Sequence, residues 1–165
     1  MNSFDITDTG RFVKALLSED FFAKMLLYYA EIKGACRIEI DGRLNRDFYD
    51  SGDEALITPG GRNISYIRWG NIRNQFFEGI RGSRLPLRFS VSLITDPDFL
   101  YDFVTSSGVN IRPDEVESLN INIMYDRGGL TVTTGNSYKI FTLDKNLDTI
   151  WDSFVHNTFK ELDIL

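Results

Sequence analysis

"LNINIMYDRGGLTVTTGNSYKIF", residues 119–141, is the stretch that decides the fold class of this chain. Apolar residues alternate with short polar ones over residues 119–125, and they do so again over residues 130–133. Alternation with a period of two is typical of strands that bury one face, and residues 126–129 between them predict a tight turn. Residues 135–136 are Gly-Asn and predict a second turn, so we expect a C-terminal three-stranded antiparallel meander.

About four helices are expected around this meander. Apolar residues recur at helical spacing over residues 147–162, which predicts a long amphipathic C-terminal helix that covers one face of the sheet. Residues 7–17 and 97–108 each begin with residues that suit a helix start, and apolar positions follow. Residues 65–82 form the fourth predicted helix, with the serine at 65 as its N-cap and the glycine at 82 as its end.

Further strands are expected before the meander. Residues 36–40 and 87–93 alternate between apolar and polar side chains, and residues 4–6 suit a short edge strand. Residues 22–33 fit either a buried strand or a helix, and we predict a strand that forms a hairpin with 36–40. Because hairpins and helices are interspersed without strict β-α-β alternation, the predicted fold class is α+β with a mainly antiparallel sheet.

Length and composition favour one soluble unit. The chain has 165 residues, of which 42% are hydrophobic, so it can bury a core and we assign residues 1–165 to a single globular domain. The longest apolar run, residues 25–30, is far shorter than the roughly 20 residues of a membrane-spanning helix. No signal peptide is recognisable, and the lone cysteine excludes an internal disulfide. We therefore expect a cytoplasmic protein that does not enter membranes.

Six arginines gather between residues 62 and 88 against a single acid, which gives this segment a charge of +5 in a chain of net charge −6. Such an asymmetry can mark a site for an anionic partner, although the leading explanation is that the arginines pair with the acidic remainder of the chain. Arg81, Arg84 and Arg88 follow one another at the exit of the predicted helix. Their guanidinium groups suit phosphate or carboxylate, so they are the candidate ligand-binding residues.

Side chains that could carry catalysis are few. The only histidine, His156, projects away from the apolar stripe of the C-terminal helix, and Cys36 occupies a strand position that we expect to be buried. Residues 144–155 begin like a calcium-binding loop but have Thr149 and Val155 where glycine and glutamate are required. We therefore predict no catalytic residues, no metal and no cofactor.

The acidic residues between 41 and 54 form the remaining candidate for chemistry. Their carboxylates could hold magnesium or act as an acid and base in hydrolysis. Arg43 and Arg46 lie among them, which favours a solvated loop whose charges compensate one another.

Two stretches, IDGRLNRDFYD at residues 40–50 and YDRGGLTVTTGNSYKIFTLDKNLDTIWD at residues 125–152, resemble a family of uncharacterised bacterial domains. The resemblance implies an anaerobic Gram-positive source and brings no activity, cofactor or catalytic residue with it. The order of elements is also similar to a repeat unit of DNA sliding clamps, although the long C-terminal helix departs from that pattern.

The sequence therefore predicts a non-catalytic cytoplasmic domain that acts by binding, with a protein as its partner. The alternative is a domain that binds nucleic acid or another polyanion through the arginine-rich segment 62–88. A metal-assisted hydrolase that uses the acidic loop 41–54 comes third.

Overall fold

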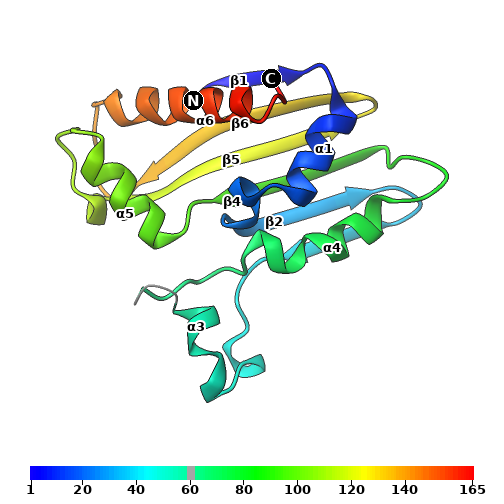
Figure 1. Ribbon diagram of the computed structural model, residues 1–165, viewed down its shortest axis with the longest axis horizontal. Coiled ribbons are helices and arrows are strands. Elements are labelled where there is room, and N and C mark those ends of the chain that lie inside the picture. The colour runs from blue at the N-terminus through cyan, green and yellow to red at the C-terminus, as the bar shows by residue number, and fades with distance from the viewer. Residues whose placement is uncertain (59–61) are drawn as a thin grey trace.

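A six-stranded sheet forms the centre of the molecule, which a computed structural model describes over residues 1–58 and 62–165 (Figure 1). The strands are β1 (Ser3–Ile6), β2 (Leu26–Lys33), β3 (Arg37–Asp41), β4 (Arg88–Ile94), β5 (Val116–Asp126) and β6 (Gly129–Tyr138). They lie in the order β1-β6-β5-β4-β2-β3 from edge to edge, and every neighbouring pair is antiparallel.

Helices cover one face of this sheet, and one short helix lies apart from it. They are α1 (Thr9–Ser18), α2 (Asp20–Ala23), α3 (Glu54–Ile57), α4 (Trp69–Ile80), α5 (Pro97–Ser106) and α6 (Asn146–Glu161). Figure 1 shows α1, α4 and α6 lying across the sheet, with α3 set apart from it. The predicted α+β class with an antiparallel sheet is therefore confirmed. Within the described residues, no helix has the length and apolarity needed to cross a membrane.

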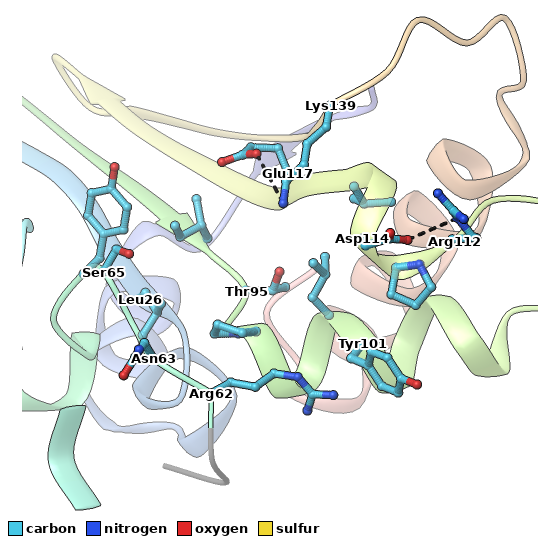
Figure 2. A pocket seen from close by; sticks show the side chains of 16 residues that line it. Leu26, Arg62, Asn63, Ser65, Thr95, Tyr101, Arg112, Asp114, Glu117 and Lys139 are labelled. Carbon is cyan, nitrogen blue, oxygen red and sulfur yellow. Dashed lines mark ion pairs between the residues drawn. The ribbon is translucent and has the colours of Figure 1, made fainter. Parts of the chain in front are cut away.

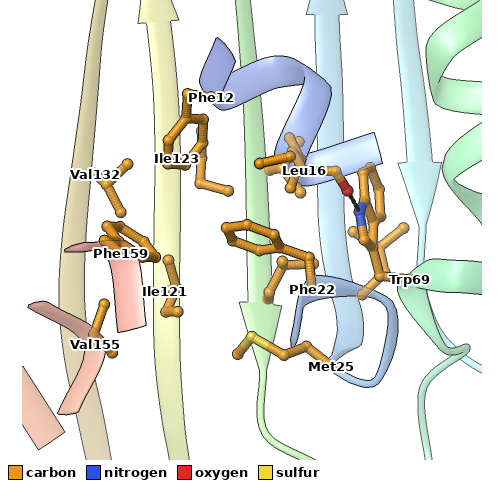
Figure 3. Close-up of a cluster of buried hydrophobic side chains, with 14 of the residues drawn as sticks. Phe12, Leu16, Phe22, Met25, Trp69, Ile121, Ile123, Val132, Val155 and Phe159 are labelled. Carbon is orange, nitrogen blue, oxygen red and sulfur yellow. Dashed lines mark hydrogen bonds between the residues drawn. The ribbon is translucent and has the colours of Figure 1, made fainter. Parts of the chain in front are cut away.

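The core lies between these helices and the inner face of the sheet (Figure 3). Phe12 of α1 and Phe159 of α6 meet edge to face with ring centroids 5.7 Å apart. Trp69, the first residue of α4, donates a hydrogen bond from Nε1 to the Leu16 carbonyl oxygen at 2.8 Å. In β5 the odd-numbered residues over 119–125 are buried, which confirms the predicted alternation.

The C-terminal part of the predicted meander is wrong. Residues 135–136 do not turn the chain, because β6 continues through them to Tyr138. The side chains of Asn136 and Tyr138 both donate hydrogen bonds to Oδ1 of Asp148 in α6. These bonds satisfy polar groups that β6 turns toward α6, so the strand can continue where the sequence pattern predicts a turn. β6 pairs with β5 on one side and with the N-terminal strand β1 on the other, so β1 takes the place of the third strand that the sequence predicts after β6.

Residues 22–33 divide into two elements. The segment begins in α2, where Phe22 is buried, and β2 starts only at Leu26, so the predicted strand is correct from that residue onward. The expected hairpin with β3 is present. Cys36 lies in the exposed turn of this hairpin, which corrects its predicted buried position, because β3 begins one residue later.

The residues that precede α4 are extended and not helical as predicted. The carbonyl oxygen of Ser65 accepts a hydrogen bond from the Leu44 N–H at 2.9 Å, so Ser65 is not the N-cap. Tyr66 makes a β-bridge with Arg43 farther along the same segment. These contacts hold the segment against the chain that follows β3, and α4 therefore starts only at Trp69.

Candidate functional site

A cleft of about 690 Å³ opens at the end of the sheet where β4 ends and β5 begins (Figure 2). Its walls come from residues 62–66, from α5 and from residues 112–117, and Lys139 closes one side. Leu26 and Ile94 contribute apolar surface from the ends of two paired strands. Small-molecule sites commonly measure about 300 to 1,000 Å³, so the cleft has a suitable size for one.

Thr95 occupies the centre of the lining, directly after β4 (Figure 2). Its backbone N–H donates to the Leu119 carbonyl oxygen at 2.9 Å, and only 7% of the residue is exposed. Its hydroxyl oxygen is buried and has no hydrogen-bond partner among the described residues. An unsatisfied buried hydroxyl costs about 1–3 kcal/mol, so a hydrogen-bonding atom from a ligand would be favourable at this point.

Thr95 also borders a second cavity of about 270 Å³. Phe21, Phe99 and Trp151 are among the residues that line this cavity. The threonine therefore lies where the cleft and the second cavity approach each other.

Arg62 is held on the cleft wall by two contacts. Its Nη1 donates to Oδ1 of Asp98 at 2.7 Å, and its guanidinium carbon lies 4.3 Å from the centre of the Tyr101 ring. The hydrogen bond to Asp98 raises the pKa of Arg62 above its ordinary value, and burial acts in the opposite direction. Within residues 1–58 and 62–165, Asp98 is the one hydrogen-bond partner of Arg62, and its remaining N–H groups suit a planar acceptor.

Arg112 and Lys139 supply two further cations to the lining. Arg112 Nε lies 3.3 Å from Oδ1 of Asp114, and Lys139 Nζ lies 3.9 Å from Oε2 of Glu117 (Figure 2). More than half of each of these four side chains is exposed, so the ion pairs contribute little to stability. Both cations can therefore exchange their partners at low cost.

The predicted ligand-binding arginines do not line the cleft. Arg81 pairs with Glu78 at 3.1 Å, and Arg88 pairs with Asp126 at 2.9 Å. Arg84 is exposed in the connection between α4 and β4. Two of the three guanidinium groups thus have carboxylate partners within the chain.

The other arginines of segment 62–88 are engaged as well. Arg68 bonds to Asp96 at 3.0 Å, and Arg73 donates to the Glu19 carbonyl oxygen at 3.2 Å. Of the six, Arg62 alone lines the cleft. The sequence marks this segment through its high density of arginines. Thr95 has no comparable sequence signal, because a threonine at the end of a strand is common.

The acidic loop 41–54 uses its carboxylates for local structure. Asp50 Oδ1 accepts from the Gly52 N–H, and Asp53 Oδ2 accepts from the Asp50 N–H, each at 3.0 Å. These reciprocal bonds form a capping box at a short 3₁₀ turn. In the described part of the chain, no three histidine, cysteine or acidic side chains are arranged to hold a metal ion.

His156 does not project freely into solvent as predicted. It is half-buried, and its ring centroid lies 5.8 Å from that of Phe4 in β1. The angular projection misplaced it because β1 covers that side of α6, a contact between the two ends of the chain.

These observations define a class of protein: an α+β domain with one antiparallel sheet, helices across one face and, at one end, a cleft lined by both polar and apolar residues. The chain belongs to the family of unknown function DUF5721, whose family model matches residues 15–165. The matched range contains every residue that lines the cleft. No curated protein and no solved structure matches the chain. The expected membership of an uncharacterised family is confirmed, while the bacterial source and the likeness to clamp repeat units stay predictions.

Proposed function

We propose that this protein is a non-catalytic binding domain and that the cleft beside Thr95 is its site for a small molecule. The observation that carries the proposal is the buried Thr95 hydroxyl, which lacks a partner within the described residues and belongs to a residue of the cleft lining. Native proteins satisfy most buried polar groups, so an unsatisfied one inside a cleft is a reason to expect a ligand.

The chemistry of the lining supports binding over catalysis. Its polar groups are hydrogen-bond donors and paired charges, such as Arg112 with Asp114 and Lys139 with Glu117. The lone histidine of the chain packs on Phe4 and is not part of the lining. Orientation by hydrogen bonds and charge is what these side chains supply.

We further propose that residues 1–165 act as one domain in the cytoplasm. Buried apolar residues from Phe4 to Ile164 belong to a single cluster, which supports one folding unit. The exposed thiol of Cys36 supports a reducing compartment.

The polyanion alternative has weaker support. Arg62, Arg68, Arg81 and Arg88 each form an ion pair with a carboxylate of the same chain. A polyanion that bound along this segment would have to displace several of these partners at once, and the chain as a whole carries a net charge of −6 that repels it.

A fragment screen tests the proposal. A mixed library of acidic, neutral and basic fragments would be added to the ¹⁵N-labelled protein, and backbone amide shifts would be mapped by NMR. We expect fragments to shift the amides of Thr95 and of residues 114–117. Ser65→Trp, at an exposed position in the lining, should fill the cleft and abolish these shifts.

Ser83→Trp is the matched control, because Ser83 is also exposed but lies outside the lining. This variant should bind the same fragments as the unmodified protein. Fragments that bind only outside the cleft, or that bind Ser65→Trp unchanged, would contradict the proposal.

A further inference from the structure

Three positive side chains lie together at the cleft, although the chain as a whole is anionic. The lining carries three positive side chains, Arg62, Arg112 and Lys139, and two negative ones, Asp114 and Glu117, which gives it a net charge of +1. The whole chain has a net charge of −6. Two further acids lie just outside the lining, where Asp98 pairs with Arg62 and Glu115 pairs with Arg112. The site therefore offers an anion three cations in one place, and each of them has a carboxylate partner within the chain.

The three cations reach the cleft from separate parts of the chain. Arg62 follows the α3 region, Arg112 precedes β5 and Lys139 follows β6. In Figure 2, Thr95 lies between Arg62 and Lys139. The fold therefore gathers positive charge around the buried hydroxyl that lacks a partner among the described residues, which is a second and independent indication of a ligand.

The three cations differ in how firmly their partners within the chain hold them. Arg62 is fixed by Asp98 at 2.7 Å and by the Tyr101 ring, so its orientation is set before a ligand arrives. Lys139 has one exposed partner at 3.9 Å, and Arg112 has an exposed partner, Asp114, at 3.3 Å and a less exposed one, Glu115, at 3.5 Å. Exposed ion pairs contribute little to stability. A ligand acid group can therefore replace those partners at little cost.

The lining also has apolar residues, which favour an organic ligand over a bare inorganic ion. Leu26, Ile94, Pro97 and Leu100 contribute to the surface of the cleft. Burial of a ligand's hydrocarbon part against such side chains is favourable because it removes apolar surface from water.

We infer that the cleft binds a small organic anion, a carboxylate or a phosphate ester, whose acid group lies between Arg62 and Lys139 and whose body covers the apolar lining. The inference rests on the proposed function and adds the chemical class of the ligand. Guanidinium and ammonium groups bind both kinds of acid through charge-assisted hydrogen bonds.

Titration with matched probes tests this inference. Benzoate, phenyl phosphate and the neutral benzamide share one ring and differ in the acid group, and binding would be followed through the amide shifts of Thr95 and residues 114–117. We expect at least one acid to bind about tenfold or more tightly than benzamide. The stronger of the two acids identifies carboxylate or phosphate as the preferred group.

Charge-removing variants locate the acid group. Arg62→Gln/Lys139→Gln should weaken the binding of the preferred acid by about tenfold or more. Arg84→Gln/Lys160→Gln removes the same charge at exposed positions outside the lining and should leave binding unchanged.

Three results would overturn the inference: benzamide binds as tightly as both acids, the two double variants weaken binding equally, or neither acid shifts the amides of the cleft. If neutral fragments still bind in the cleft while the acids do not, the proposed function stands and only the ligand class is wrong. If neither fragments nor acids bind there, both fail.

Discussion

Tyr138 donates a hydrogen bond of 2.5 Å from its hydroxyl group to Oδ1 of Asp148, which joins the last residue of β6 to the first turn of α6. The same oxygen accepts from Asn136, and Lys145 Nζ lies 3.5 Å from the other carboxylate oxygen. Asp148 is buried, so these partners replace the water that its charge would otherwise bind. The contact anchors the C-terminal helix to the sheet.

Removal of the Asp148 charge should destabilise the fold. Asp148→Asn keeps the shape of the side chain but weakens three interactions, and we expect the free energy of unfolding to fall by about 1–3 kcal/mol in urea titrations. Glu161→Gln, at an exposed position of the same helix, should change it by less than about 0.5 kcal/mol. Equal effects in the two variants would show that the Asp148 contacts contribute no special stability.

The stability that Asp148 contributes should depend on pH. Burial raises the pKa of Asp148, but the hydrogen bonds from Tyr138 and Asn136, together with the charge of Lys145, outweigh it and hold the pKa below its ordinary value. The unfolded state then takes up a proton first as the pH falls. The contribution is therefore complete at neutral pH, and it is lost below a pH of about 4 as the carboxylate of the folded state also titrates.

Urea titrations of the unmodified protein and of Asp148→Asn at several pH values measure this directly. The difference in unfolding free energy between the two proteins should be constant near neutral pH and should shrink in acid. A difference that grows as the pH falls would contradict the assigned direction of the pKa.

The same substitution at two buried threonines should change the free energy of unfolding in opposite directions. Thr95 has no hydrogen-bond partner in the described residues, so Thr95→Val should raise the free energy of unfolding by about 1–3 kcal/mol. Thr134 donates to Asp152 and accepts from the Asn2 N–H at 3.0 Å, so Thr134→Val should lower it by a similar amount. Thermal and urea unfolding of both variants, without added ligand, provide the comparison. Destabilisation by Thr95→Val would show that its hydroxyl is satisfied in solution.

Gly42 should not tolerate a side chain. A Cβ atom there would lie 1.7 Å from the Leu27 carbonyl oxygen, because the chain after β3 passes directly over the start of β2. Gly42→Ala should lower the free energy of unfolding by about 3 kcal/mol or more, since backbone atoms would have to move. A Cβ atom at Gly34 would lie 3.9 Å from its nearest neighbour, so Gly34→Ala should have little effect. Calorimetric melting of the two variants separates these outcomes.

Part of the fold could be read from periodicity. The alternation in β5 and the apolar stripe of α6 come from local spacing, and both elements form where that spacing predicts them. The predictions from sequence are wrong where contacts between residues far apart in the chain override the local pattern. Residues 135–136 remain in a strand, where the Asn136 side chain donates a hydrogen bond to Asp148. Ser65 does not cap a helix, because its carbonyl oxygen accepts a hydrogen bond from the Leu44 N–H.

The cleft could not be predicted in this way. Arg62, Thr95 and Lys139 lie more than thirty residues apart in sequence, and none has a neighbour that marks it as functional. Arg81, Arg84 and Arg88 attracted attention because they are close in sequence, but two of them pair with Glu78 and Asp126. A cluster of arginines in the sequence does not show which of them form ion pairs with acidic residues in the folded protein.

The sequence by itself determined the α+β class, the antiparallel pairing and the helix that covers the sheet, because these follow from local hydrophobic periodicity and turn residues. Only the tertiary structure decided where the polar groups find partners. Tyr138 reaches Asp148 across the boundary between sheet and helix, whereas the hydroxyl of Thr95, within the described residues, reaches none. A hydrogen bond depends on distances of about 3 Å in space, and spacing along the chain does not fix those distances.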